Sequence, residues 1–261
     1  MRADSPAACA YRRMIGYFVP NIKRERVNDG RFADSARPHK IRSHPMSIDV
    51  TVSTELPMEP QIFLAAQALL NGEIVIFPTE TVYGIAADAA NDEAISHLIS
   101  LKNRPDNKPF PVMVRDIAMA ETLVELGAAR ELAADYWPGP LTLVLPRKAC
   151  LCDACVSDGM IGIRCPNHPA AQAILNIANI PLAVPSANVT GEKPPTTSTE
   201  ARRVFMYQEI AFRILQPNAT EGTPTTVLKI EPTKWTILRK GPVSADTIRE
   251  YLPQGVTLCE V

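Results

Sequence analysis

Residues 73–84 read Glu-Ile-Val-Ile-Phe-Pro-Thr-Glu-Thr-Val-Tyr-Gly, an apolar run that passes directly into a polar turn. The run Glu73–Phe77 is short and rich in β-branched residues, which is typical of a buried strand. The segment Pro78–Gly84 then places hydroxyl groups at the carboxyl end of that strand, where open α/β sheets usually bind ligands. Viewed alone, the same segment could equally be a turn in which Thr79 or Thr81 hydrogen-bonds the backbone.

Helical and strand-like patterns alternate along the rest of the chain. Apolar residues recur at helical spacing from Pro60 to Leu70, and Asn71-Gly72 is a good signal for the helix end. Asn91 or Asp92 can cap a second helix, which we expect Pro105 to end because the residue before a proline disfavours helical backbone. Alternating helices and strands predict an α/β fold with a twisted, mostly mixed β-sheet flanked by helices. The other expected helices are Ile117 to Tyr136, Pro169 to Asn179, Thr199 to Met206 and one from Ser244, and the other strands are Leu141 to Leu145, Ile161 to Arg164, Pro181 to Val184, Ile210 to Leu215, Thr226 to Ile230 and Thr236 to Arg239.

The composition is that of a soluble globular protein, with 46% hydrophobic and 21% charged residues among 261. We expect a single domain over residues 46–261. No run approaches the roughly eighteen apolar residues that a membrane helix needs, and no secretory signal is present, which predicts a cytoplasmic protein. Six cysteines in so long a chain do not form the dense framework of a small secreted domain, so reduced thiols are expected.

Residues 1–45 differ from the rest of the chain. They hold ten Lys or Arg against four Asp or Glu and show no sustained helical or strand periodicity. We expect a disordered extension, or an upstream extension of a gene whose natural start is Met46, that contributes nothing to catalysis. An Arg-rich targeting sequence is the alternative, although the acidic residues count against it. The body of the chain is slightly acidic, so any anion site there must be built locally.

Three cations lie close together at the predicted exit of a helix. Lys102, Arg104 and Lys108 fall within seven residues, where long side chains can converge on one anion. The chain has neither a phosphate-binding P-loop motif nor a dinucleotide-binding glycine fingerprint, so side chains would have to hold the phosphates of a nucleotide. The alternative is a solvated charged turn.

A second polar turn, Pro185-Ser186-Ala187-Asn188, follows another apolar strand, and two such turns at comparable strand ends predict one shared pocket. Arg164 ends a third strand and could bind a carboxylate at the same rim, or else form a structural ion pair. Ser186 is not a convincing hydrolase nucleophile, because no histidine stands in an obvious base context and no Gly-x-Ser-x-Gly elbow occurs.

Cysteines cluster at Cys150, Cys152 and Cys155, with Cys165 and His168 downstream. These residue types can bind zinc, but the paired Cys-x-x-Cys spacing of common structural zinc sites is absent. Free loop thiols are the favoured interpretation, and no residue is assigned to a metal. The body of the chain also lacks a basic patch with interleaved aromatic residues for RNA.

Taken together, the motifs resemble the YrdC-type threonylcarbamoyl-AMP synthase family over about residues 55 to 250. Their order and separation match jointly, although each motif alone is weak. They are Pro78-Thr-Glu-Thr-Val-Tyr-Gly84, Lys102-Asn-Arg-Pro105, Trp137-Pro-Gly-Pro-Leu-Thr-Leu-Val144, Ile161-Gly-Ile-Arg-Cys-Pro166 with His168-Pro169, Pro185-Ser-Ala-Asn188 and Leu238-Arg-Lys-Gly241.

The resemblance implies a YrdC-like sheet with a concave groove for ATP and L-threonine. It implies a nucleotidyltransferase that makes threonylcarbamoyl-AMP and pyrophosphate from L-threonine, bicarbonate and ATP, with Mg²⁺ on the phosphates. The product would serve threonylcarbamoyladenosine modification of tRNA, with tRNA, double-stranded RNA binding and pathway proteins as further expectations. Thr81, Arg164 and Ser186 are similar to threonine contacts. The positions similar to ATP contacts are Lys102, Arg104, Lys108, Asn188, Thr196 and Arg239.

Lys102 and Arg104 are the residues expected to act in catalysis by neutralising charge between the α-phosphate and the leaving pyrophosphate. Each change to Ala is expected to lower turnover about a hundredfold while barely moving the melting temperature.

Two segments depart from the family pattern. Gly222-Thr-Pro-Thr-Thr-Val-Leu-Lys229 stands where synthases commonly carry Gly-x-Glu-Ser-Thr-Val-Val-Asp, and it resembles the YciO-like branch. Pro194-Pro195-Thr196 replaces the usual Ser-Pro-Thr. A YciO-like, non-catalytic RNA- or nucleotide-binding protein is therefore the alternative. The chain ends soon after its last expected helix, which suggests the short form of the family.

Overall fold

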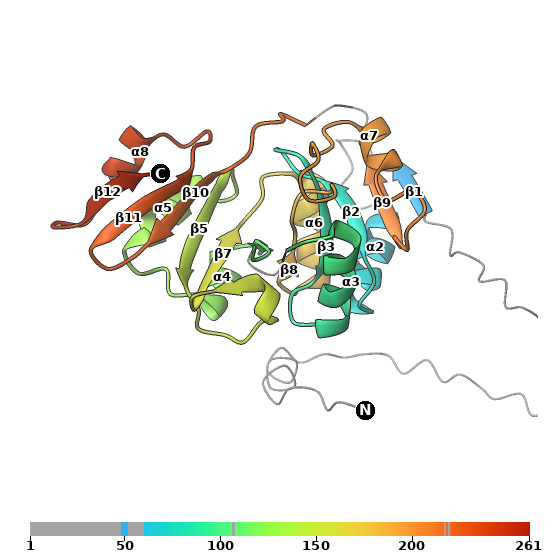
Figure 1. Ribbon diagram of the computed structural model, residues 1–261, viewed down its shortest axis with the longest axis horizontal. Helices are drawn as coiled ribbons and strands as arrows, with labels where there is room; N and C mark the ends of the chain where they lie inside the picture. Colours follow the sequence, from blue (N-terminus) through green and yellow to red (C-terminus); the bar gives the residue numbers. More distant parts are fainter. Residues whose placement is uncertain (1–47, 52–59, 106–107, 217, 219) are drawn as a thin grey trace, which may run out of the picture.

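A computed structural model describes residues 48–51, 60–105, 108–216, 218 and 220–261. Figure 1 shows a long curved sheet with helices packed on it, and the described part of the chain ends beside β11 and β12. The helices are α2 Pro60–Leu70, α3 Asp92–Lys102, α4 Ile117–Leu123, α5 Arg130–Tyr136, α6 Pro169–Ala178, α7 Ser198–Arg203 and α8 Ala245–Arg249, with short 3₁₀ turns at Gly127–Ala129 and Asp153–Cys155. The strands are β1 Ile48–Thr51, β2 Val75–Pro78, β3 Tyr83–Asp88, β4 Val112–Met113, β5 Leu141–Pro146, β6 Val156–Ser157, β7 Met160–Arg164, β8 Leu182–Ala183, β9 Phe212–Leu215, β10 Thr226–Ile230, β11 Lys234–Arg239 and β12 Thr257–Glu260.

The twelve strands form one mixed sheet in the order β1-β9-β2-β3-β8-β4-β7-β5-β10-β11-β12, with β6 paired to β7. Strands β2 and β8 are both antiparallel to β3, which lies between them. They therefore run in the same direction, so the polar turns that follow them emerge at the same edge of the sheet. The predicted α/β fold with a mixed sheet is confirmed.

Two apolar clusters make up the core. One packs α2 and α6 against β2 and β9, and it includes Leu69, Phe77, Ile174 and Ile214. The larger cluster runs beneath α3, α4 and α5 and continues to Trp235 of β11. Helices therefore flank the sheet (Figure 1). Strands β2 and β3 are buried throughout their length because they lie inside the sheet, away from its edges.

Three local expectations were wrong. The segment 117–136 is not one helix, because Val124 is extended and Gly127 has a φ of +48°, which separates α4 from α5. Helix α3 ends at Asn103 in the left-handed conformation rather than at Pro105. The polar turn Pro78–Gly84 also runs into β3, a strand that the expected elements omitted.

The predicted disordered extension, residues 1–45, lies outside the described residues. Within the described part, no helix is long and apolar enough to span a membrane.

Candidate functional site

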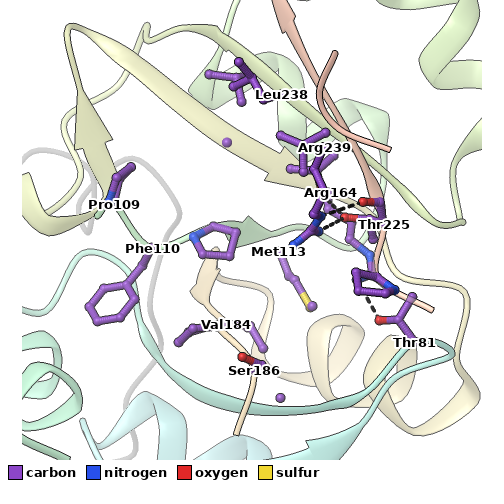
Figure 2. A pocket seen from close by; sticks show the side chains of 18 of the residues that line it. Thr81, Pro109, Phe110, Met113, Arg164, Val184, Ser186, Thr225, Leu238 and Arg239 are labelled. Carbon is purple, nitrogen blue, oxygen red and sulfur yellow. Dashed lines mark hydrogen bonds between the residues drawn. The ribbon is translucent and has the colours of Figure 1, made fainter. Parts of the chain in front are cut away.

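A cavity of about 620 Å³ opens over the curved face of the sheet, between the two polar turns and strands β5, β7, β10 and β11. Thr79 and Thr81 line it from the turn after β2. Ser186 lines it from the turn after β8, and Figure 2 shows Thr81 and Ser186 in the cavity wall. The predicted shared pocket is therefore confirmed. The backbone joins the two turns directly, because Gly84 and Ser186 form an isolated antiparallel bridge.

Arg164 is the buried charge of the cavity wall. Arg164 is only 6% exposed, and its Nη1 donates to the Thr81 hydroxyl at 3.2 Å. Its Nη2 lies 2.6 Å from Oε2 of Glu80, so the ion pair that the sequence left open is present. That contact does not have hydrogen-bond geometry, and Nε and Nη2 of Arg164 are buried without a hydrogen-bond acceptor. Nη2 has the Glu80 carboxylate as its ion-pair partner, whereas Nε has no partner. Because buried donors rarely remain unpaired, Nε points to a further acceptor, such as an anionic ligand in the cavity.

A second arginine lies near the first. Arg239, at the end of β11, donates from Nε to the Thr225 carbonyl at 2.9 Å and from Nη2 to the Thr225 hydroxyl at 2.7 Å (Figure 2). Thr142 holds that hydroxyl from the other side at 2.9 Å. Desolvation lowers the pKa of Arg239, and the nearby positive charge of Arg164 lowers it further. Two guanidinium groups that repel each other across one cavity favour an anion between them.

Lys102 does not line the cavity. It is the last residue of α3, is 2% exposed, and donates from Nζ to the carbonyls of Ser186 at 2.5 Å and Asn188 at 2.6 Å. Burial, followed by the charge of Arg104, lowers its pKa from 10.5 to about 7. The lysine therefore lies beneath the Ser186–Asn188 turn and holds it in place. Its burial contradicts, at Lys102, the alternative of a solvated charged turn.

Arg104 and Lys108 lie on the segment that follows α3. Arg104 donates to the carbonyls of Lys108 at 2.7 Å and Pro109 at 2.6 Å, and its guanidinium stacks 4.5 Å above the ring of Phe110. Burial lowers its pKa. Lys108 is exposed. Arg104 thus shapes the Pro109–Phe110 wall of the cavity, although neither Arg104 nor Lys108 lines it.

The other two expected nucleotide contacts also lie behind the cavity wall. Asn188 is buried and donates through Nδ2 to the carbonyls of Val189 and Glu192, which leaves its Oδ1 without a partner. The Thr196 hydroxyl donates to Glu200 at 3.2 Å, next to the cap of α7. Of the nine expected site residues, the cavity therefore brings together Thr81, Arg164, Ser186 and Arg239.

Comparison with known proteins identifies the family. A family model for Sua5, YciO and YrdC proteins, described as telomere recombination, matches residues 67–241. The chain belongs to this family. The threonylcarbamoyl-AMP synthase of Bacillus subtilis is 36% identical over 208 residues, which make up 78% of this chain and 60% of that protein.

Solved structures of the Sua5/YciO/YrdC family share the fold. The crystal structure of Pyrococcus abyssi Sua5 with L-threonine superposes with a TM-score of 0.74 at 29% identity, covering 81% of this chain and 62% of that one. E. coli YciO superposes with a TM-score of 0.69 at 22% identity and is covered over 96% of its length. The chain thus spans about three fifths of the Bacillus and Pyrococcus proteins and nearly all of YciO.

Several cavity residues of this family member were not among the expected contacts. Thr142 lies on β5 and Thr225 directly precedes β10. Alternate residues of a strand share a face of the sheet, so the strand pattern held a signal for both threonines. Phe110 and Met113 also line it and provide apolar surface. Nothing in the sequence around Glu80 indicates that it pairs with Arg164, because only the folded chain brings these two residues together.

The cysteine cluster does not form a metal site among the described residues. No group of three or more His, Cys, Asp or Glu side chains lies there in a position to hold a metal ion. Cys152 and Cys155 are buried, while Cys150 is exposed, and all three are free thiols. Burial raises the pKa of Cys155 to about 12 and that of Cys165 to about 11, so these thiols remain protonated at neutral pH.

Proposed function

We propose that the protein is an L-threonylcarbamoyladenylate synthase, a nucleotidyltransferase that converts L-threonine, bicarbonate and ATP into threonylcarbamoyl-AMP and pyrophosphate. The observation that carries the proposal is the buried guanidinium of Arg164, which lines a cavity of about 620 Å³ and whose Nε has no hydrogen-bond acceptor. A planar, always charged fork of donors is the group best suited to a carboxylate. The related Bacillus protein bears the name of this activity, and L-threonine is bound in the related Pyrococcus structure.

The chemistry needs no protein nucleophile. The threonine amine attacks the carbon of carbon dioxide or bicarbonate to give a carbamate, with water released when bicarbonate is the donor. A carbamate oxygen then attacks the α-phosphorus of ATP, and the bond to the bridging oxygen breaks to expel pyrophosphate. Positioning and charge neutralisation are sufficient for such steps, and they match a site that is rich in arginine and hydroxyl groups.

The remaining expected residues have distinct places in this proposal. Arg239 would neutralise phosphate charge from the cavity wall, since it lies close enough to Arg164 for their charges to interact. Lys102 and Asn188 would contribute by holding the Ser186–Asn188 turn in position. A direct contact with the nucleotide would require their present hydrogen bonds to break. Arg104, Lys108 and Thr196 would contact the phosphates only after moving from their present positions. Ser186 already faces the cavity.

Mg²⁺ would enter with the nucleotide. The described residues contain no carboxylate cluster for a resident ion, which fits an ion held chiefly by phosphate oxygens. When bound, such an ion neutralises charge on the phosphates. We place the reaction in the cytoplasm, upstream of adenosine modification in tRNA, because a carbamoyl adenylate is an activated acyl group that a further nucleophile must accept.

The direct test measures pyrophosphate released from ATP and Mg²⁺ with bicarbonate, in the presence and absence of L-threonine. We expect release that requires both threonine and bicarbonate. Arg164→Lys is the informative variant, because it keeps the charge and loses the fork; it should raise the KM for threonine about tenfold or more and change that for ATP less. No release above a control without protein would defeat the proposal. Salt-sensitive RNA binding that ATP does not affect would then favour the YciO-like alternative.

A further inference from the structure

The turn after β2 contains two linked hydroxyl groups, and the donor and the acceptor of each of their hydrogen bonds can be deduced. The Thr79 hydroxyl lies 2.6 Å from the Val82 carbonyl oxygen and 2.9 Å from the Thr81 hydroxyl. A carbonyl oxygen can only accept, so the single hydroxyl hydrogen of Thr79 must point to Val82; otherwise two acceptors would face each other at 2.6 Å. The Thr79 oxygen is then an acceptor with two lone pairs, of which the amides of Thr81 and Val82, both at 3.3 Å, share one.

The direction of the next hydrogen bond follows. Because Thr79 has no hydrogen left, Thr81 must donate its own hydroxyl hydrogen to Thr79. Nη1 of Arg164 donates to the Thr81 oxygen at 3.2 Å and occupies one of its two lone pairs. Thr81 is 2% exposed, and both threonines line the cavity. Toward a ligand, the Thr81 hydroxyl is therefore an acceptor with one free lone pair and no free hydrogen.

We propose that Thr79 is a positioning residue that fixes Thr81 as an acceptor for the amine of the substrate, so that the site selects α-amino acids over carboxylic acids without an amine. The proposal rests on the proposed function. Arg164 contacts Thr81 through Nη1 and keeps Nε without an acceptor, so the site can bind an anion at Arg164 and a hydrogen-bond donor at Thr81, at neighbouring points. An α-amino acid carries that pair of groups on one carbon atom. By accepting an N–H hydrogen, Thr81 leaves the nitrogen lone pair free to attack carbon.

The test compares two ligands by NMR titration: L-threonine, and 3-hydroxybutanoate, which keeps the carboxylate and hydroxyl but lacks the amine. Thr79→Val is nearly isosteric and frees the Thr81 hydrogen to point elsewhere. We expect it to weaken threonine about tenfold, the effect of one hydrogen bond, and to change 3-hydroxybutanoate by less than about threefold. Thr79→Ser, which restores the hydroxyl, should bind threonine within about threefold of wild type.

Two further variants keep the test decisive if Thr79→Val folds poorly. Thr81→Val should show the same loss for threonine alone, and the Thr79→Val/Thr81→Val double variant should lose no more than Thr81→Val, because both changes remove one shared interaction. An equal loss for both ligands, or additive losses, would overturn the proposal. Wild-type protein that binds threonine but releases no pyrophosphate would defeat the proposed function and leave this binding comparison intact.

Discussion

At the scale of single residues, the site depends on buried charges whose partners come from distant parts of the chain. Arg164 pairs with Glu80, and the two side chains are 8% and 11% exposed. Lys102 instead has two backbone carbonyls as partners, from Ser186 and Asn188. Removing one partner of such a buried group leaves the other unsatisfied, so these residues affect stability as well as chemistry.

The stability of the protein should therefore depend on pH through Lys102. Its pKa falls from 10.5 to about 7 on folding, so the cost of burying its charge is fully present below pH 7. Between about pH 7 and 10.5 the unfolded state binds more protons at this residue, and the free energy of unfolding gains a contribution that rises with pH. In Lys102→Met this contribution is absent. We expect the advantage of wild type over the variant to grow by about 1 kcal/mol per pH unit from pH 7 to 9.

Urea unfolding of both proteins at several pH values measures this difference. The variant also loses the two hydrogen bonds from Nζ, which adds an offset that does not vary with pH over this range. Parallel stability curves for wild type and variant would contradict the prediction. From the sequence, a change of Lys102 was expected to leave the melting temperature nearly unchanged. If the lost hydrogen bonds lower the melting temperature of the variant, that expectation is wrong.

At the scale of elements, close backbone contacts hold the cavity wall. Gly241 follows β11, and a Cβ there would lie 2.3 Å from the amide nitrogen of Thr226 and 2.5 Å from the carbonyl carbon of Thr225. Thr225 in turn holds Arg239 in the cavity wall. The absence of a side chain at Gly241 thus allows the segment that positions this arginine to pack against the end of β11.

Gly241→Ala should consequently destabilise the protein by about 1–3 kcal/mol, since backbone rather than a flexible side chain must move. It should also weaken pyrophosphate release through displacement of Arg239. Gly162→Ala is the matched control: its new methyl group meets only methyl groups of Thr142 and Val144, both at 3.8 Å, and it enters the cavity. We expect this control to keep its urea midpoint and lose turnover. Equal destabilisation of the two variants would refute the role assigned to Gly241 in the close packing of the backbone.

At the scale of the whole molecule, the sheet joins segments from both ends of the described chain. Strand β1 at Ile48–Thr51 pairs with β9 at Phe212–Leu215, and β12 at Thr257–Glu260 pairs with β11 at the opposite edge. Side chains also tie the last part of the chain to the body, because the Tyr251 hydroxyl donates to Asp135 at 2.6 Å. The cavity lies between these edges and takes residues from strands β3 to β7, β10 and β11.

Two truncations test how far the folded unit extends. A chain beginning at Met46 keeps β1 and should retain both its stability and its turnover. A chain beginning at Met58 loses β1 and leaves β9 as an exposed edge, which should lower the free energy of unfolding by about 2 kcal/mol through lost backbone hydrogen bonds. Urea unfolding and the pyrophosphate assay distinguish the two. Loss of activity in the longer chain would show that residues 1–45 contribute to the folded protein.

The local sequence determined most elements, because their signals are short-range. Strand β5, helices α2 and α6 and the cap at Asn91 followed from apolar spacing, proline, glycine and capping residues, and the two polar turns predicted a shared pocket. The break between α4 and α5 did not follow, because a single glycine with positive φ outweighed a continuous apolar pattern.

Only the tertiary structure decided which charged residues face the ligand. The spacing of Lys102, Arg104 and Lys108 suggested one cationic group, but the fold turns Lys102 under the Ser186–Asn188 turn and stacks Arg104 on Phe110. The pairing of Glu80 with Arg164 and the approach of Arg239 to Arg164 likewise join residues far apart in the chain. The physical reason is that the burial and partners of a charge depend on which strands meet in space, whereas spacing along the chain specifies only its immediate neighbours.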